Sequence, residues 1–369
     1  MEDQFRRRSE RPSEPSSYGA SQREGAIIGF GFIAEKGHLP AYLARRDFSI
    51  AAVADVCGPR RELARKLLPN ARIYEDAQSL FAAEKRLDFV DIATPPRDHA
   101  SIACAAMARG MNVLCEKPLA ASLHDAEMVL AEAHRCKRTF FPIHNYKFAP
   151  SMRAVRDIID SGRIGAVNLV TLDTFRTQHA RGVSEWLPDW RRIRGWAGGG
   201  IAMDHGAHTF YLVFDWLGGD PLSITAKMSS TGAYDTEDNF SCTVTFPTGV
   251  AMARLTWNAA VRKVIYTIHG DQGAIKLEDD DIEVAVKGQP VERRSIASHW
   301  GDASHKEWFG SVLDRFGAAI EAGEYVGPDA RDAALCVHVI ETAYASSRSG
   351  CVEMSLAPAL HGLANVVTK

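Results

Sequence analysis

The sequence predicts an α/β protein in two parts, a parallel sheet covered by helices and then an α/β domain with a large, mainly antiparallel sheet. Up to residue 148, short apolar runs alternate with helical stretches, the rhythm of β-α-β units in doubly wound folds. Beyond Pro150 the apolar runs follow one another closely and are joined by hairpin-like turns, as in an antiparallel sheet. The chain has 369 residues, enough for two domains that each bury a core.

The first part covers residues 25–148, and its predicted strands are short and apolar. Strands are expected at 26–29, 50–55, 73–74, 89–93, 112–115 and 139–143, and helices at 33–45, 59–68, 79–83, 99–109 and 123–135. The preceding residues, 1–24, are rich in Arg, Ser, Glu and Pro and lack the apolar core of a signal peptide. They are therefore predicted to form a disordered tail.

The second part covers residues 149–369. A helix at 151–161 leads into a long strand at 166–176 that no crossover helix follows. Further strands are expected at 223–229, 239–246, 250–257, 263–269, 274–277 and 282–286. Segments 246–250 and 270–273 carry the Pro, Gly and Asp of tight turns, and helices at 305–322 and 329–348 follow.

Composition limits the classes of partner. The formal net charge of −3 provides no electrostatic basis for binding nucleic acid or an anionic membrane. No run approaches the roughly twenty apolar residues of a transmembrane helix. The cysteines are scattered without a CxxC pair, which favours a reduced, cytoplasmic protein over a disulfide framework. A small molecule is therefore the expected partner.

A glycine-rich turn follows the first predicted strand and opens a helix. In this GxGxxA turn, Gly29 permits the tight turn, Gly31 lets the backbone approach a pyrophosphate, and Ala34 lets the helix pack close to the sheet. The helix N-terminus at Phe32 and Ile33 supplies N–H donors and a positive dipole. The turn predicts a dinucleotide site.

Asp55 ends the second predicted strand, where an acidic residue accepts hydrogen bonds from the adenosine ribose. A carboxylate there repels a 2′-phosphate, which favours NAD as the cofactor. Arg60 and Arg61 follow closely and keep NADP as an alternative. In the competing interpretation, Asp55 is only a turn residue at the end of the strand.

Thr94-Pro95-Pro96 follows the fourth predicted strand. A rigid turn without N–H donors at the proline positions is suited to form the floor of a nicotinamide pocket. Thr94 and Pro95 are therefore assigned to the cofactor site, together with His99. Alternatively, His99 only opens the next helix.

The strand at 112–115 ends in Glu116-Lys117-Pro118, the most informative stretch of the chain. Leaving Lys117 at the end of a buried strand costs desolvation free energy, so its position requires a reason. In open α/β sheets, ligands bind in the crevice beyond the carboxyl ends of the strands. Glu116 and Lys117 are predicted to face the cofactor, and Lys117 the substrate as well.

Gly198-Gly199-Gly200 precedes an apolar helical stretch that carries Asp204 and His208 one turn apart on one face. With Lys117 they provide a carboxylate, an imidazole and a cation, a set suited to oxidising an alcohol to a ketone. His208 is the candidate base for the hydroxyl proton, while a hydride leaves the same carbon for nicotinamide. Lys117 is expected to stabilise the developing charge on oxygen, and Asp204 to bind a neighbouring hydroxyl.

Other interpretations of this segment stay open. Asp204 and His208 could be buried polar groups satisfied by the protein itself. Asp204, His205 and His208 could instead bind a metal, although no HExxH motif or further clustered ligand supports a metal site. Three tryptophans that either stack on a sugar or fill a domain junction lie just before the glycines: Trp186, Trp190 and Trp196.

Several separated motifs together resemble the Gfo/Idh/MocA family, named for glucose–fructose oxidoreductase, inositol 2-dehydrogenase and a rhizopine catabolism protein. The resemblance runs from about residue 25 to residue 286. The motifs that carry it are the glycine turn, the Glu116-Lys117-Pro118 tripeptide, the glycine triplet with Asp204 and His208, the domain-linking stretch 146–150, and Trp190-Arg191.

The resemblance implies that Lys117, Asp204 and His208 are catalytic, that Tyr146 is part of the substrate site, and that Trp190 and Arg191 approach the nicotinamide. Two positions depart from the family pattern. Pro96 stands where Asn is common, and Lys147 stands where Arg is common, which puts a bidentate contact in doubt.

The resemblance also implies a Rossmann NAD-binding domain, followed by a substrate-binding domain that forms homo-oligomers through its open sheet. The implied reaction is the NAD(P)-dependent, reversible oxidation of a secondary hydroxyl of a sugar, glycoside or inositol. Some relatives instead cleave glycosides through transient 3-keto oxidation. A non-catalytic NAD-binding sensor is the other alternative, and the intact set of Lys117, Asp204 and His208 argues against it.

Overall fold

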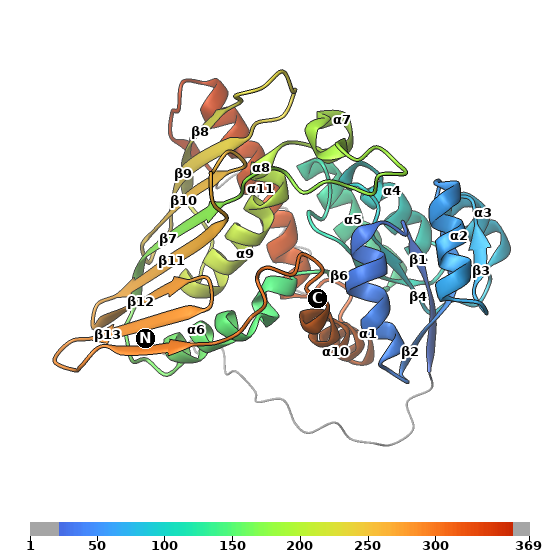
Figure 1. The fold of residues 1–369 in the computed structure, drawn as a ribbon, viewed down its shortest axis with the longest axis horizontal. Coiled ribbons are helices and arrows are strands. Elements are labelled where there is room, and N and C mark those ends of the chain that lie inside the picture. The colour runs from blue at the N-terminus through green and yellow to red at the C-terminus, as the bar shows by residue number, and fades with distance from the viewer. Residues whose placement is uncertain (1–21, 357–369) are drawn as a thin grey trace.

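The computed structural model describes residues 22–356 and contains two β-sheets with helices packed around and between them (Figure 1). The first sheet consists of β1 (Arg23–Ile28), β2 (Phe48–Ala54), β3 (Arg72–Tyr74), β4 (Phe89–Ile92), β5 (Asn112–Cys115) and β6 (Phe140–Pro142). Neighbouring strands are all parallel, in the order β3-β2-β1-β4-β5-β6. This strand order is that of dinucleotide-binding Rossmann sheets, so the predicted fold is confirmed.

Helices alternate with these strands in the predicted order. They are η1 (Ala34–His38) continuing into α1 (Leu39–Leu43), α2 (Gly58–Leu67), α3 (Ala77–Ala83), α4 (Pro96–Met107) and α5 (Leu123–Cys136). Successive residues of β1 point to opposite faces, so that Ile27 and Ile28 belong to separate apolar clusters. The sheet is therefore buried on both faces, which explains why its strands are apolar throughout.

Two details of the N-terminal part differ from prediction. The predicted tail ends earlier than expected, because Arg23 and Glu24 are already in β1, where Arg23 pairs with Phe48. Residues 1–21 of that tail lie outside the described residues. The helix predicted at 33–45 contains a π-helical turn, Ala34–His38, in which His38 is turned into the core.

The second sheet consists of β7 (Val167–Phe175), β8 (Ser223–Ser229), β9 (Asn239–Thr245), β10 (Val250–Thr256), β11 (Lys263–Gly270), β12 (Gly273–Glu278), β13 (Asp281–Val286), β14 (Glu292–Ser295) and β15 (Met354–Ser355). Its order is β14-β13-β12-β11-β7-β10-β9-β8-β15, and only β7 and β10 pair in parallel. The predicted hairpins β9–β10 and β11–β12 are present. The sheet is mainly antiparallel, as predicted.

Two strands of this sheet have no counterpart in the prediction. All four residues of β14 are exposed and polar, and β15 has two residues, so neither has an apolar alternation to detect. The predicted apolar helix around His205 is divided into α8 (Ile201–Asp204) and α9 (Gly206–Leu217). The remaining helical elements are η2 (Asn145–Phe148), α6 (Pro150–Asp160), η3 (Trp190–Arg192), α7 (Arg194–Ala197), α10 (Lys306–Ala322) and α11 (Pro328–Arg348).

Helices α6, α9 and α11 lie on one face of the large sheet (Figure 1). Helices α10 and α11 also return to the N-terminal sheet. On α10, Phe309 and Phe316 pack in the same cluster as Phe48 and Phe89 of the parallel sheet, and α11 adds Ala333 to the cluster on its other face. The two sheets are thus held together around a shared cleft. Within residues 22–356, no helix is long and apolar enough to span a membrane.

Candidate active site

A cleft of about 900 Å³ lies between the two sheets and is lined by residues from both. It brings together most residues singled out from the sequence, although they are scattered along the chain. The lining includes Gly29, Gly31, Phe32, Ile33, Asp55, Thr94, Pro95, Glu116, Lys117, Tyr146, Trp190, Arg191, Asp204 and His208. His99 is the exception.

The glycine turn has the shape that a dinucleotide pyrophosphate requires. Gly29 has a φ of 90°, and a Cβ there would lie 2.8 Å from the backbone of Ala93 and Thr94. A Cβ on Gly31 would meet nothing within 4 Å, so this position leaves open space on the cleft side. Gly29 is thus required by the packing of the turn, and Gly31 leaves room for a ligand.

Asp55 serves the turn as well as lining the cleft. Its carboxylate accepts the backbone N–H of Phe30 at 2.6 Å and that of Cys57 at 2.7 Å. Arg60 donates from Nε to the carbonyl of Phe30 at 2.7 Å, and Arg61 donates to the carbonyl of Asp55 at 2.8 Å. Asp55 can therefore be a turn residue at the strand end and a ribose ligand at the same time. Both arginines are engaged by backbone carbonyls, which does not favour a 2′-phosphate contact.

The assignment of His99 to the cofactor site is wrong. Its side chain is fully buried and does not line the cleft. Its ring nitrogens lie 2.8 Å from the carbonyl oxygens of Pro118 and Thr94. His99 therefore ties the Lys117-Pro118 segment to the turn after β4, and it acts on the site only through these backbone groups.

Glu116 is held by a buried charge network beneath the cleft. It accepts the backbone N–H of Lys117 at 3.0 Å, and its other oxygen lies 3.2 Å from Nε2 of His38. His38 Nδ1 lies 3.0 Å from a carboxylate oxygen of Asp91, which also accepts the hydroxyl of Tyr42. Burial alone would lower the pKa of His38, but Asp91 and Glu116 outweigh it and raise this pKa to about 9. His38 is thus an imidazolium that fixes the loop carrying Lys117.

Lys117 and Asp204 form an ion pair inside the cleft. Lys117 Nζ donates to the carboxylate of Asp204 at 3.0 Å and to its backbone carbonyl at 2.8 Å. Arg191 Nε lies 3.4 Å from the same carboxylate oxygen, and His205 Nδ1 lies 3.2 Å from the other. Burial would raise the pKa of Asp204, but the charges of Lys117 and Arg191 hold it well below its usual range. Asp204 is therefore ionised at neutral pH.

His208 lies beside this pair and is neutral. Burial first, and then the positive charge of Lys117, hold the pKa of His208 well below its ordinary value. The ring stacks on Tyr146 with centroids 3.8 Å apart, and Nδ1 lies 2.7 Å from the hydroxyl of Tyr211. That hydroxyl also accepts the backbone N–H of Tyr146. The imidazole is therefore fixed in the plane and position that its neighbours impose.

The loop before the glycine triplet covers one side of the cleft. Trp186 and Trp196 pack edge to face with centroids 5.1 Å apart, and the guanidinium of Arg97 lies 3.2 Å from the centroid of a Trp196 ring. Trp186, Trp190 and Trp196 all line the cleft. Arg97 belongs to α4 of the N-terminal part, so these aromatic residues lie at the junction and border the ligand space at the same time.

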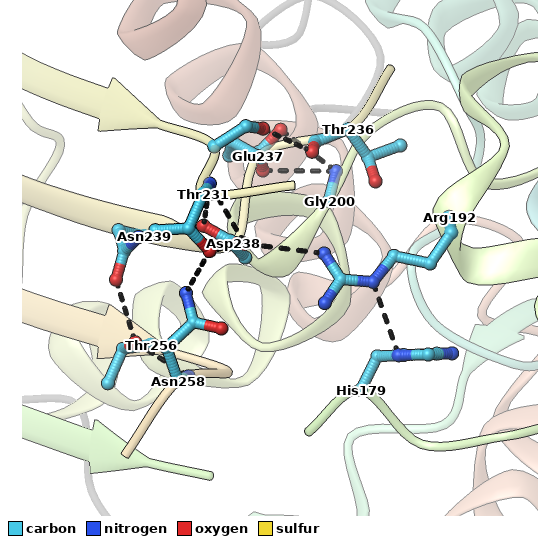
Figure 2. A network of polar contacts seen from close by, with 11 residues as sticks. His179, Arg192, Gly200, Thr231, Thr236, Glu237, Asp238, Asn239, Thr256 and Asn258 are labelled. Carbon is cyan, nitrogen blue, oxygen red and sulfur yellow. Dashed lines mark hydrogen bonds and ion pairs between the residues drawn. The ribbon is translucent and has the colours of Figure 1, made fainter. Parts of the chain in front are cut away.

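The glycine triplet is explained by a polar network behind it (Figure 2). The carboxylate of Glu237 accepts the backbone N–H groups of Gly200 and Ala202 and the hydroxyl of Tyr344. A Cβ on Gly199 would lie 2.0 Å from the Tyr344 hydroxyl, and one on Gly200 would lie 1.8 Å from the Glu237 carbonyl oxygen. Glu237 thus caps α8, the helix that carries Asp204, and only glycine fits under the cap.

The network extends from Glu237 toward the loop that covers the cleft. Asp238 accepts the backbone N–H and hydroxyl of Thr231 and lies 3.7 Å from Arg192 (Figure 2). Arg192 donates from Nε to Nδ1 of His179 at 3.2 Å. These buried groups connect the large sheet to the segment that carries Trp190 and Arg191.

Lys147 does not line the cleft. Its Nζ lies 2.7 Å from Asp329 and 3.5 Å from Asp332, both on α11. The lysine therefore anchors the domain-linking segment to α11. Its ammonium makes this charge contact without the bidentate geometry of the arginine that is common at this position in the family.

Sequence reasoning missed four residues that hold the candidate residues of the cleft in place: His38, Tyr211, Glu237 and Tyr344. Tyr211 follows His208 by three residues in a helix, a spacing that places the two side chains on one face and could have identified it. The others come from elements distant in sequence. Within residues 22–356, no group of three or more His, Cys, Asp or Glu side chains is arranged to hold a metal ion.

Comparison with known proteins identifies two matched domains. Residues 24–144 match an oxidoreductase family with an NAD-binding Rossmann fold, and residues 152–276 match the GFO/IDH/MocA C-terminal domain. The chain is 27% identical to inositol 2-dehydrogenase from Rhizobium meliloti over 333 residues, which covers 87% of this chain and 95% of that protein. It is 34% identical to D-apiose dehydrogenase from Paraburkholderia graminis over 142 residues, 38% of this chain and 37% of that protein.

Among solved structures, the chain resembles an oxidoreductase from Agrobacterium radiobacter in complex with NAD+, L-tartaric acid and magnesium. The TM-score is 0.80 at 22% identity, covering 91% of this chain and 99% of that one. The two matched domains, in the order and with the sheet topologies described above, lead to one conclusion: the chain belongs to the GFO/IDH/MocA family of oxidoreductases with an NAD-binding Rossmann fold.

Proposed function

We propose that this protein oxidises a secondary hydroxyl of a sugar, glycoside or inositol to a ketone, reversibly, with NAD as the hydride acceptor. The observation that carries the proposal is the meeting of Lys117, Asp204 and neutral His208 in the cleft that the glycine turn also lines. The names of related proteins support the substrate class, because inositol 2-dehydrogenase and D-apiose dehydrogenase act on polyhydroxylated molecules.

Lys117 would bind the reacting oxygen. Of the three N–H groups on its ammonium, two are directed to Asp204, one at the carboxylate and one at the carbonyl. The third remains to donate to the substrate oxygen and to stabilise the negative charge that develops there. Asp204 keeps Lys117 charged and oriented, and its other lone pairs can accept from a neighbouring substrate hydroxyl.

His208 would take the hydroxyl proton. A base must be unprotonated at the working pH, and burial together with Lys117 keeps the imidazole in that form. When the Tyr211 hydroxyl accepts from Nδ1–H, the lone pair of Nε2 is free to receive the proton. Tyr211 is thus a positioning residue whose hydroxyl can hold the productive tautomer.

The residues present fit the cofactor. Gly31 leaves the open space that a pyrophosphate needs beside the helix N-terminus, and Asp55 lies at the end of β2 where the adenosine ribose would bind. Glu116, Thr94, Pro95, Trp190 and Arg191 would surround the nicotinamide. A bound nicotinamide supplies the acceptor for the hydride that leaves the substrate carbon. The engagement of Arg60 and Arg61 by backbone carbonyls favours NAD over NADP.

The test is NADH formation at 340 nm against inositols, free sugars, sugar acids and glycosides. Lys117→Ala and His208→Ala should each lower kcat by about 10²- to 10⁴-fold, while NAD binding, measured by calorimetry, persists. Turnover close to wild type in both variants would contradict the proposal. Glycoside cleavage without net NADH formation would favour the transient-oxidation alternative.

The large sheet has a face that bears on the assembly of the protein. No helix within residues 22–356 covers the second face of the large sheet (Figure 1), and Met252 on that face is 47% exposed. Arg254 and Asp173 form a bidentate ion pair there. We propose that two copies associate through this face, which sedimentation of wild type and Met252→Glu would test.

The seven unpaired cysteines agree with a reducing, cytoplasmic location.

A further inference from the structure

Two arginines lie on the buried face of the large sheet, where charged side chains are not expected. Along β7 the inward-facing positions are Val170, Leu172 and Thr174, and the next in this alternation is Arg176. Along β11 they are Ile268, Tyr266 and Val264, followed by Arg262. Both arginines line the cleft that contains Lys117 and His208.

The register of these strands brings the two arginines opposite each other at the end of the pairing. Antiparallel β11 and β7 pair Lys263 with Phe175, and one further step brings Arg262 opposite Arg176. Like charges opposite each other on paired strands are unfavourable. Consistent with this, burial first and then the charge of Arg176 lower the pKa of Arg262.

The protein does not neutralise this pair. Among residues 22–356, no carboxylate lies within 4 Å of the Arg176 guanidinium, whose one hydrogen bond goes to the carbonyl of Phe175. Arg262 donates to the carbonyl of Trp300, and its nearest carboxylate, Asp279, lies 3.7 Å away. Asp279 also lies 3.2 Å from Lys263, so its charge is shared. Two partly buried cations without a full counter-charge point to an anion from outside the chain.

The surrounding groups place this anion on the substrate rather than on the cofactor. Trp300 and His305 line the same part of the cleft, and His305 packs edge to face on Tyr146, which stacks on His208. Nδ1 of His305 is buried without a hydrogen-bond partner. Burial and the nearby charges of Arg262, Arg176 and Lys117 lower the pKa of His305 to about 4 against the opposing effect of Asp302. The two arginines therefore lie beside the catalytic groups, on the large-sheet side of the cleft.

We propose that Arg176 and Arg262 bind a carboxylate of the substrate, so that the enzyme acts on a sugar acid, such as a uronic acid or its glycoside, in preference to the neutral sugar. This inference rests on the proposed function and specifies its substrate class. A planar guanidinium matches the two oxygens of a carboxylate, and two adjacent guanidinium groups can share one such anion. The carboxylate would fix which hydroxyl of the ring reaches Lys117 and His208.

The test compares substrates that differ only at this group. The NAD complex is assayed with D-glucose and D-glucuronate, D-galactose and D-galacturonate, and methyl glucoside and methyl glucuronide, with the matching sugar phosphates alongside. We expect kcat/KM for the acid to exceed that for its neutral partner by about 10- to 100-fold. Calorimetry should show a lower dissociation constant for each acid than for its neutral partner.

Variants identify the residues responsible. Arg176→Gln and Arg262→Gln should each lower the acid-to-neutral ratio of kcat/KM by about 10-fold or more, mainly through KM. Arg176→Gln carries the smaller risk of misfolding, because the guanidinium of Arg176 bonds only to the backbone of the preceding residue. Arg293→Gln, an exposed position on β14 outside the cleft, removes the same charge and should leave the ratio unchanged.

Equal or better use of the neutral sugars would overturn the inference and leave the proposed function standing. So would preference for a sugar phosphate over the matching acid, or a ratio that neither arginine variant alters. Failure to oxidise any member of this panel or any inositol, with NAD bound, would overturn both the proposed function and this inference.

Discussion

Replacing Lys117 with Gln tests the proposed chemistry most directly, because the ammonium has two separable effects in the cleft. It leaves one N–H for the proposed contact with the substrate oxygen, since the other two are directed to Asp204. Losing one charge-assisted donor at a developing oxyanion costs about 10²- to 10³-fold in kcat. Its charge also depresses the pKa of His208, second in importance only to burial.

The second effect predicts a change in the pH profile. In the wild type, the pKa of His208 lies well below its ordinary value, so the base stays unprotonated and activity should persist below pH 6. In Lys117→Gln the pKa of His208 rises, and that of Asp204 rises as well, because Lys117 is the main charge that lowers it. The acidic limb of kcat/KM should therefore move to higher pH.

The assay is NADH formation from pH 5 to pH 9 with the best substrate of the screen. Lys227→Gln, an exposed lysine on β8, controls for loss of a positive charge. A variant with reduced kcat but an unshifted acidic limb would refute the assignment of His208 as the base. Turnover equal to wild type would refute the role of Lys117 itself.

Three other changes should have distinct signatures. Tyr211→Phe removes the partner of His208 Nδ1 and should lower kcat by about 10-fold with little change in KM, and an equal fall in NAD affinity would contradict this. In wild type, the raised pKa of His38 contributes stability that is complete below pH 6.5 and lost as pH rises through about 9. Thermal melts should show this loss. His38→Gln should abolish it because glutamine does not titrate, and this variant should be less stable than wild type by about 3 kcal/mol at pH 6.5. Asp55→Ala removes the carboxylate that accepts the backbone N–H of Phe30 in the glycine turn and that of Cys57 after β2, so NAD binding by calorimetry should weaken at least ~10-fold.

The fold was predictable because its signals are local. Strands such as β5 and β8 begin and end where the apolar runs predicted, and the hairpins follow turns rich in Gly, Pro and Asp. The meeting of the candidate residues in one cleft was predictable for a similar reason. Lys117 stands at a strand end where a cation is costly, and Asp204 and His208 stand close together after a glycine triplet.

What remained hidden depends on contacts between distant segments. Glu237 meets Gly200 through the packing of β9 against α8, and His38 reaches Glu116 because a π-helical turn rotates it inward. His99 was misassigned because its position next to Pro95 resembles a cofactor contact, whereas the two carbonyls that surround its ring are visible only in three dimensions.

The return of α10 to the parallel sheet has a consequence for how the chain can be divided. A fragment ending near residue 148 would expose the rings of Phe48 and Phe89 to water, since Phe316 of α10 packs on both of them. The nucleotide-binding half is therefore completed by residues that are translated after strands β7 to β14 of the large sheet. Expression of that half alone should yield aggregates, and adding a segment equivalent to 306–322 back in trans should restore a soluble particle.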